Sequence, residues 1–481
     1  MKKIIVYIIS LWVFTCTSCT DQFTELNKNP NAPVEVLPEL LFRKVLYDQA
    51  DQMSLEAFVA GNTLSQYFTS IDFNLFDRHG LATPQYGGNP WNFLYENLRD
   101  TEIILEKSRA NAAFAVYEGP ALIYKAYLTM LLTDLYGDVP YSEALRGKSG
   151  IIAPAYDTQE AIYTGDKGIL ANLKQGISLI NNYKGSQRLQ GDILYNGQLA
   201  KWVKLGNSLQ LKAYMRISNQ RDVRAEIQKL VADNQFITQA TDNAIFNFTA
   251  TQPTNFKMST ARIGDFNLYI MSETMEEILR RYQDPRMQVF FRPTAANNQV
   301  YRGLRNGPDA STLSISVSNY SFAGTIFRED AGRLKANFMT SFEVNFLLAE
   351  AAEKGWITGN AQTYYEQGVK DAFQFWNTSL PSDYLTTGTA AFSKENTSKR
   401  IEQIITQKWI ANILNGYEGW IEFRRTGFPA LKPVTASLNQ GLFPVRMPYP
   451  ATESALNNVN YRVAADKTNN NSINSPVWWD K

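Results

Sequence analysis

The fold class is decided by TSFEVNFLLAEAAEKG at residues 340–355 and AQTYYEQGVKDAFQFW at residues 361–376. Apolar side chains recur in both stretches at the three- and four-residue spacing of an amphipathic helix. A short turn with Gly359 joins them, which is typical of a tetratricopeptide helical hairpin, although the repeat is degenerate and spacing alone does not establish it. The small residues that would let the two backbones approach closely are Ala349, Ala351, Ala352, Gly368 and Ala372.

Helical periodicity extends over most of the chain on the N-terminal side of this pair and continues after it. One segment opens with Gly119-Pro120 and keeps helical spacing as far as Gly137, a residue that ends helices. The sequence therefore predicts a mostly α fold. The ranges that predict helices are 39–69, 91–110, 119–136, 159–182, 198–218 and 398–415.

Two regions depart from this pattern. Residues 235–335 are rich in Thr, Asn, Gly and Pro, and they predict an irregular, loop-rich region with minor short β-strands and a helix around 271–282. The Asn-rich tail from residue 456 predicts an extended coil.

The N-terminus has the pattern of a lipoprotein signal peptide. Lys2 and Lys3 precede an apolar run, and small residues lead to Cys19, so residues 1–18 predict a signal peptide and Cys19 the lipidated residue. Lipidation of Cys16 and an ordinary cleaved signal are the alternatives. Three prolines break any helix between 19 and 38, and we interpret this segment as a lipidated tether before one domain over 39–481.

Charge and residue usage exclude several classes of protein. The 47 Lys and Arg residues nearly balance 46 Asp and Glu residues, so no basic surface is expected to attract nucleic acid. His79 is the one histidine and reads as a loop residue that makes a hydrogen bond, which excludes any site needing two histidines. We expect no metal and no cofactor. Paired carboxylates stay possible, and with them a surface glycosidase.

Some residues predict structural roles. Trp202 is expected in the core, and Arg216 on the same predicted helix is expected to pair with a buried acid. Arg424 and Arg425 lie close to Trp420 in sequence, a pattern that predicts a network of charges and stacked rings.

One stretch combines aromatic rings with hydrogen-bonding side chains as glycan sites do. It is SQYFTSIDFNLFDRHGLATPQYGGNPWNFLYENL at residues 65–98. Trp91 fits the apolar face of the helix that follows, which favours a core role for it over a ligand platform. The irregular region supplies a second set, for which packing between loops is an equal alternative. The candidate ligand-binding residues are Asp72, Asn74, Asp77, Arg78, Tyr86 and Trp91, with Tyr320 and Phe327 from the irregular region.

Several segments resemble the SusD/RagB-like outer-membrane lipoproteins of Bacteroidetes, and the second SusD-like subfamily most closely. They include LTDLYGDVPYSEAL at 132–145, GDILYNGQLAKWVKLGNSLQLKAYMR at 191–216, EGWIEFRRTGFP at 418–429 and PVWWDK at the C-terminus. The resemblance implies a tetratricopeptide-like helical scaffold with an irregular binding face. It also implies a protein that is not an enzyme, sits lipid-anchored on the cell surface, and passes oligosaccharides to a SusC-like TonB-dependent transporter. The RagB-like branch implies peptides as the alternative ligand.

Overall fold

The computed structural model describes residues 36–81, 87–309, 311 and 316–480. The predicted signal peptide, Cys19 and nearly all of the tether lie outside the described residues, and so does Tyr86. The division of the chain into signal peptide, tether and one domain stays a prediction.

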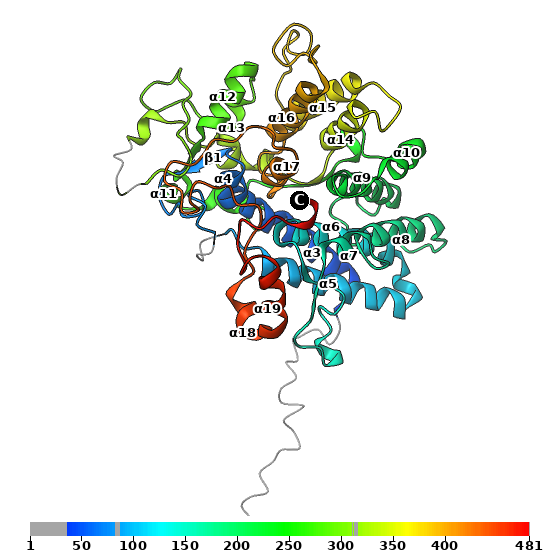
Figure 1. The fold of residues 1–481 in the computed structure, drawn as a ribbon. Coiled ribbons are helices and arrows are strands. Elements are labelled where there is room, and N and C mark those ends of the chain that lie inside the picture. Colours follow the sequence, from blue (N-terminus) through cyan, green and yellow to red (C-terminus); the bar gives the residue numbers. More distant parts are fainter. Residues whose placement is uncertain (1–35, 82–86, 310, 312–315, 481) are drawn as a thin grey trace, which may run out of the picture.

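Long helices form most of the molecule, which confirms the predicted fold class (Figure 1). Successive helices pack as hairpins: α5 lies on α6, α6 on α8, α8 on α9, and α14 on α15. The bounds of these helices and of the others in the scaffold are α3 Pro38–Glu56, α5 Trp91–Ala110, α6 Glu118–Tyr136, α7 Gln159–Thr164, α8 Ile169–Asn182, α9 Leu199–Ile217, α10 Arg224–Asp233, α14 Ser341–Glu353, α15 Ala361–Phe375, α16 Thr397–Ala411 and α17 Glu418–Thr426.

Small residues allow the helices of each hairpin to pack closely against each other. A Cβ atom built on Gly176 of α8 would lie 2.7 Å from the carbonyl oxygen of Gly119 on α6, so both helices need glycine where they cross. On α15, a Cβ atom at Gly368 would lie 2.9 Å from the ring of Phe346 on α14. The helical hairpin predicted for 340–376 is confirmed, with Ala349 and Ala372 fully buried between its helices.

Two predicted helices have different bounds in the structure. The range 39–69 begins as α3, continues as the π-helix η1 over Ala57–Gly61 and the short α4 over Asn62–Leu64, and then becomes extended. The range 159–182 is divided into α7 and α8, because the backbone at Gly165 and Gly168 is extended and ends the first helix.

Short strands and turns fill the irregular region, as predicted, and α12 matches the helix expected around 271–282. Among the described residues, three antiparallel pairs of strands form: β4 of this region with β6 at its C-terminal end, β5 of this region with β1, and β2 with β3 outside it. The bounds are β1 Phe68–Ser70, β2 Val139–Pro140, β3 Tyr156–Asp157, β4 Ala244–Asn247, β5 Tyr269–Met271, β6 Lys335–Met339, α11 Ile263–Phe266, α12 Glu273–Tyr282 and α13 Met287–Phe290. The 3-10 turns are η2 Ala112–Tyr117, η3 Gly147–Ser149, η4 Ala240–Asp242, η5 Lys257–Thr260, η6 Val317–Asn319, η7 Thr325–Phe327, η8 Ala331–Arg333 and η9 Trp478–Asp480.

The predicted extended tail is wrong. Residues Ala451–Leu456 and Asn458–Lys467 form two helices, α18 and α19, and Ala464 and Ala465 bury one face of the second. The asparagines that suggested coil serve instead as anchors. Asn460 donates its side-chain amide to the carbonyl of Ala153 at 2.9 Å, a tertiary contact that composition does not reveal.

A buried network of ion pairs joins the helices of the scaffold. Arg216 on α9 binds Glu418 at 2.9 Å and Glu422 at 2.6 Å on α17, and its Nε lies 3.1 Å from Asp134 on α6. Burial alone would raise the pKa of Glu422, but Arg425, Lys408 and Arg216 overcome it and hold that pKa well below its ordinary value. The predicted pairing of Arg216 with a buried acid is therefore confirmed.

The network extends through the C-terminal segment. The guanidinium of Arg424 lies 4.5 Å from the ring centroid of Trp420 and 4.5 Å from that of Trp479, with its Nε 3.4 Å from Asp480. Arg425 pairs with Glu350 of α14 at 2.6 Å. These contacts confirm the predicted network of charges and rings. Trp202 is fully buried, as expected.

No helix among the described residues is both long and apolar enough to cross a membrane.

We expect Arg216→Met to lower the free energy of unfolding by about 3–5 kcal/mol, because it removes the cation paired with buried Asp134 and one of the cations paired with the buried carboxylates of Glu418 and Glu422. The matched control is Arg224→Met. Arg224 makes an equally short ion pair, 2.6 Å to Asp222, but in full contact with water. Urea unfolding should show no measurable change for the control. Equal losses for the two variants would contradict a structural role for the network.

Candidate functional site

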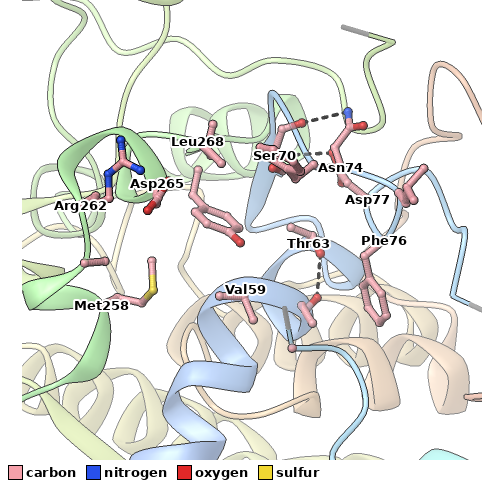
Figure 2. A pocket seen from close by; sticks show the side chains of 16 residues that line it. Val59, Thr63, Ser70, Asn74, Phe76, Asp77, Met258, Arg262, Asp265 and Leu268 are labelled. Carbon is pink, nitrogen blue, oxygen red and sulfur yellow. Dashed lines mark hydrogen bonds between the residues drawn. The ribbon is translucent and has the colours of Figure 1, made fainter. Parts of the chain in front are cut away.

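A cavity of about 550 Å³ opens in the irregular part of the molecule. Its base comes from η1 and α4, one wall from the turn after β1, and the other wall from η5, α11 and the start of β5. Figure 2 shows Arg262 and Asp265 on one side of the space, and Asn74, Asp77 and Phe76 on the other. The lining residues are Val59, Ala60, Thr63, Ser70, Phe73, Asn74, Leu75, Phe76, Asp77, Gly87, Met258, Ala261, Arg262, Asp265, Leu268 and Tyr269.

The base of the cavity is connected to the ionic scaffold. A Cβ atom on Gly61, at the end of the π-helix, would lie 1.9 Å from the carbonyl oxygen of Gly416 just before α17. The hydroxyl of Tyr417 donates to Glu56 at 2.6 Å, immediately before the π-helix. Because α17 carries the acids that bind Arg216, the network positions the residues under the cavity. A π-helix often occurs at a functional site.

Aromatic rings support the base from beneath. Phe58, within the π-helix, contacts the rings of Phe68, Phe327 and Tyr269 with centroid separations of 5.2, 5.7 and 5.0 Å. Phe58, Phe68 and Phe327 are buried. Tyr269 is half-buried and also lines the cavity, so its ring is held by the core while part of its surface faces a ligand.

Asp77 shapes the first wall. Its carboxylate accepts hydrogen bonds from the Thr69 hydroxyl at 2.6 Å and from the backbone N–H of Ser70 at 3.1 Å. It also accepts from the side-chain amide of Asn306 at 2.6 Å and the backbone N–H of Gly307 at 2.8 Å. Four donors thus tie the turn after β1 to a loop distant in sequence. Burial raises the pKa of Asp77 to about 6, although these hydrogen bonds oppose the shift.

The opposite wall carries charges that remain open to solvent. Arg262 is the N-cap residue of α11 and Asp265 lies within its single turn. Both are exposed, and neither makes an ion pair with another described residue. Their guanidinium and carboxylate groups can therefore donate to and accept from the hydroxyls of a ligand. Met258 and Leu268 beside them are apolar.

Phe73 stands at the mouth of the cavity with 83% of its surface exposed. Its φ of 48° lies in the left-handed region that bulky residues seldom adopt. The carboxylate of Asp72 accepts from the Phe73 N–H at 2.7 Å and supports this turn. An exposed large ring in a strained backbone conformation is typical of a binding residue.

The structure brings some predicted candidates to the cavity. Asn74 lines it, although its side-chain amide donates to the carbonyls of Ser70 at 3.1 Å and of Pro308. Asp72 is exposed beside Phe73 and supports the mouth. Tyr86 lies outside the described residues, next to Gly87 of the lining. Ligand contact by Asn74, Asp72 and Tyr86 stays a prediction.

Three more candidates are buried in the structure. Trp91 is buried and packs edge-on against Tyr136 at 4.9 Å, because it opens the apolar face of α5. Phe327 is fully buried beneath the base of the cavity. Asp77 reaches the lining, but its four hydrogen bonds commit it to holding loops together. Phe327 and Asp77 thus support the cavity, whereas Trp91 packs within the helical scaffold. Ligand contact by the three stays a prediction.

The remaining two candidates lie outside the cavity lining. Arg78 donates from Nε to the carbonyl of Ala436 at 2.8 Å, with Asp309 3.8 Å from its guanidinium. Tyr320 is half-buried after η6. Ligand contact by either residue stays a prediction.

Sequence reasoning did not select Arg262, Asp265 or Tyr269, and it noted Phe73 without selecting it. The segment from Met258 to Tyr269 contains no motif, and its place opposite the first wall depends on the pairing of β1 with β5. The signal that could have identified Phe73 is its position in a turn after a polar residue, in a stretch already rich in rings.

Among the residues that the structure describes, no group of three His, Cys, Asp or Glu side chains is placed to hold a metal ion. His79 is buried, and its Nδ1 lies 3.1 Å from the carbonyl oxygen of Leu442. This agrees with the predicted loop histidine that makes a hydrogen bond.

Comparison with protein families gives a match over most of the chain. The model of the second SusD-like family, described as starch-binding and associating with the outer membrane, matches residues 30–450. No curated protein sequence matches at a significant level.

Solved structures share the fold along nearly their whole length. A SusD homologue from Bacteroides fragilis is 26% identical, with a TM-score of 0.79 over 93% of this chain and 100% of that chain. A chitin-binding protein is 25% identical, with a TM-score of 0.77 over 92% of this chain and 100% of that chain. A chitin-binding SusD homologue from Flavobacterium johnsoniae is 24% identical, with a TM-score of 0.78 over 92% and 98%, and at that identity the likeness concerns the fold alone.

We expect Asp77→Asn to lower the free energy of unfolding by about 3 kcal/mol at pH 7, because an amide leaves some of the four buried donors without an acceptor. Urea unfolding followed by circular dichroism measures the loss. Asp72→Asn is the control, because Asp72 is exposed and its replacement should lower the free energy of unfolding far less.

The pH dependence gives the same test an independent readout. With its pKa raised to about 6, folded Asp77 binds a proton between about pH 4 and 6 that the unfolded chain does not hold. This extra proton on folded Asp77 therefore adds to the free energy of unfolding at low pH, and the added stability is lost as pH rises through 6. The difference between wild type and Asp77→Asn should change with pH across this interval, and parallel profiles would contradict the assignment.

Proposed function

This chain belongs to the second SusD-like family, described as starch-binding and associating with the outer membrane, and we propose that it captures nutrient oligosaccharides at the cell surface for a SusC-like TonB-dependent transporter. The site of capture in this proposal is the cavity between the turn after β1 and α11. The observation that carries it is that exposed Phe73, half-buried Tyr269, Arg262 and Asp265 line one cavity, with no ion pair from Arg262 or Asp265 to another described residue.

The chemistry of the lining suits a sugar. The C–H faces of a pyranose ring pack against aromatic rings such as those of Phe73 and Tyr269, while its hydroxyls need donors and acceptors at the edge. Arg262 and Asp265 supply one of each, and Asn74 adds an amide oxygen on the other side. About 550 Å³ lies within the range of small-molecule sites and leaves room for a short oligosaccharide.

Two glycan classes are the first to test. The family description names starch, and the 25% identical relative is a chitin-binding protein. Chitin fragments carry acetyl groups, whose methyls suit the apolar side chains of Val59, Met258 and Leu268 in the lining. We therefore propose chito-oligosaccharides as the preferred ligand over malto-oligosaccharides. A peptide is the alternative, because backbone amides use the same donors and acceptors.

Binding without catalysis is part of the proposal. Proteins of this family are described by what they bind. Glycoside hydrolysis requires two available carboxyl groups across the sugar. The described lining has two carboxyl groups, those of Asp77 and Asp265. Because Asp77 already accepts four hydrogen bonds, Asp265 has no second available carboxyl group in this lining to act with it in hydrolysis.

The membrane attachment rests on the N-terminal sequence. We propose acylation of Cys19, a tether as far as Pro38, and a domain that faces the outside of the cell. The tether would allow the domain to open from the transporter for ligand entry and close again for transfer.

Phe73→Ala should weaken binding of chitotetraose by about tenfold or more, since the ring loses its contact with the sugar face. Arg262→Ala should weaken it to a similar extent. Isothermal titration calorimetry with chitotetraose, maltotetraose and a tetrapeptide measures the affinities and ranks the three ligand classes.

Leu456→Ala is the matched control for Phe73→Ala, because Leu456 is 80% exposed on α18, outside the cavity. Unchanged affinity in Phe73→Ala and Arg262→Ala would place the site elsewhere. Release of shorter sugars during the titration, abolished by Asp265→Asn, would identify a hydrolase instead.

Cys19→Ala should abolish incorporation of a radiolabelled fatty acid and release the protein from washed outer membranes, because acyl chains supply the anchor. Cys16→Ala is the control and should retain both properties. The reverse result would assign the anchor to Cys16. Protease added to whole cells should digest the wild-type protein if its domain faces outward.

A further inference from the structure

Four polar side chains lie together on one side of the cavity, away from α11 (Figure 2). They are Thr63 of the base and Ser70, Asn74 and Asp77 of the first wall. Each is more than nine-tenths buried, so a hydrogen bond that a ligand makes or fails to make with them has a large effect. We name these four side chains the acceptor face.

The hydroxyl protons of the acceptor face are already used within the protein. Thr63 donates from Oγ1 to the carbonyl of Ala60 at 2.8 Å, and Ser70 donates from Oγ to the carbonyl of Asp72 at 2.8 Å. A hydroxyl has one proton and two lone pairs. Thr63 and Ser70 can therefore offer a ligand a lone pair on oxygen, but no proton.

The amide of Asn74 has a fixed orientation. Its Nδ2 donates to the carbonyl of Ser70 at 3.1 Å and to that of Pro308, which uses both of its protons. The reversed orientation would place Oδ1 against two carbonyl oxygens, so the nitrogen must face them. Oδ1 accepts no hydrogen bond from another described residue and is left to accept one from a ligand.

The fourth member of the acceptor face is a carboxylate. An ionised carboxylate only accepts hydrogen bonds. Because the pKa of Asp77 is about 6, this group is mostly ionised at pH 7. All four side chains can thus accept, and none of them has a proton left to donate.

The charges of the lining agree with this polarity. Among the described residues, Asp77 and Asp265 are the two carboxylates of the lining, and Arg262 is its one guanidinium. Close behind the lining, one cation and one anion offset each other, Arg328 and Glu56. The balance is negative, which disfavours an anionic ligand.

Charged side chains next to the lining in sequence do not reverse that balance. Lys257 pairs with Asp51 at 2.7 Å, and the guanidinium of Arg78 lies 3.8 Å from Asp309. Asp72 is exposed beside the mouth.

We propose that the acceptor face selects sugars that present N–H or O–H donors, so that the cavity takes neutral or N-acetylated oligosaccharides and discriminates against acidic ones. The inference rests on the proposed capture of oligosaccharides and names the class of sugar that the same site takes. A carboxylate of a uronic acid is an acceptor, so against this face it would leave the buried oxygens unpaired and repel their lone pairs. A site that uses buried polar groups in this way rejects a ligand without the matching donor.

Calorimetric titration with chitotetraose and tetragalacturonate tests the selection. Both are linear tetramers, but tetragalacturonate carries a carboxylate on every ring, whereas chitotetraose carries acetamido N–H groups. We expect the wild-type protein to bind chitotetraose about tenfold more tightly, or better.

Thr63→Val keeps the shape of the side chain and removes its acceptor. It should weaken binding of chitotetraose about fivefold and leave that of tetragalacturonate unchanged, so the ratio of the two affinities falls. Ser70→Ala should change the ratio in the same direction. The matched control is Thr101→Val, because Thr101 is buried outside the cavity and donates to the carbonyl of Asn97 in its own helix at 2.7 Å. The control should keep the wild-type ratio.

The ratio of affinities separates selection from a structural role. An unchanged ratio in Thr63→Val and Ser70→Ala would overturn the inference, whether both affinities fall together or neither changes. Equal binding of the two tetramers by the wild-type protein, or tighter binding of tetragalacturonate, would overturn it as well and leave capture of oligosaccharides standing. Binding of neither tetramer, nor of maltotetraose, would overturn the proposed function too.

Discussion

The ion pairs between Arg216 and the acids of α17 are the constraint on which the rest of the structure depends. Isolated charges could not stay buried at this depth, so each helix must supply its partner at the correct distance. Arg216 thereby fixes α9, α17 and α6 relative to one another, and Arg425 adds α14. The aromatic C-terminal segment then covers Arg424, which seals the network from water.

The candidate site inherits its geometry from that network. The loop before α17 carries Gly416, against which Gly61 ends the π-helix, and Tyr417 holds Glu56 at the start of the same turn. A base fixed in this way can support walls that have little regular structure. Asp77 performs the equivalent task in the first wall, where one carboxylate accepts hydrogen bonds from β1 and from the loop at Asn306 and Gly307.

This division of roles explains why the polar residues of the irregular region differ in availability. Asp77 uses its carboxylate, and Asn74 its amide nitrogen, for hydrogen bonds within the protein, while Arg262 and Asp265 are open to solvent. A binding site needs both kinds, because a ligand gains affinity from groups that are already positioned before it arrives. Phe73 extends the same principle to an apolar group, since the turn supported by Asp72 holds its ring outside the core.

The sequence by itself determined the helical scaffold, the hairpin over 340–376, the burial of Trp202 and the need of Arg216 for an acid. These follow from local spacing and from the high cost of burying an unpaired charge. It also marked the stretch 65–98 as rich in rings, but could not separate Phe73, which faces solvent, from Trp91, which is core. Only the tertiary structure decided which of these rings lies at a cavity. The opposite wall at Arg262 comes from the pairing of β5 with β1, and these strands are about two hundred positions apart, so no local pattern encodes their contact.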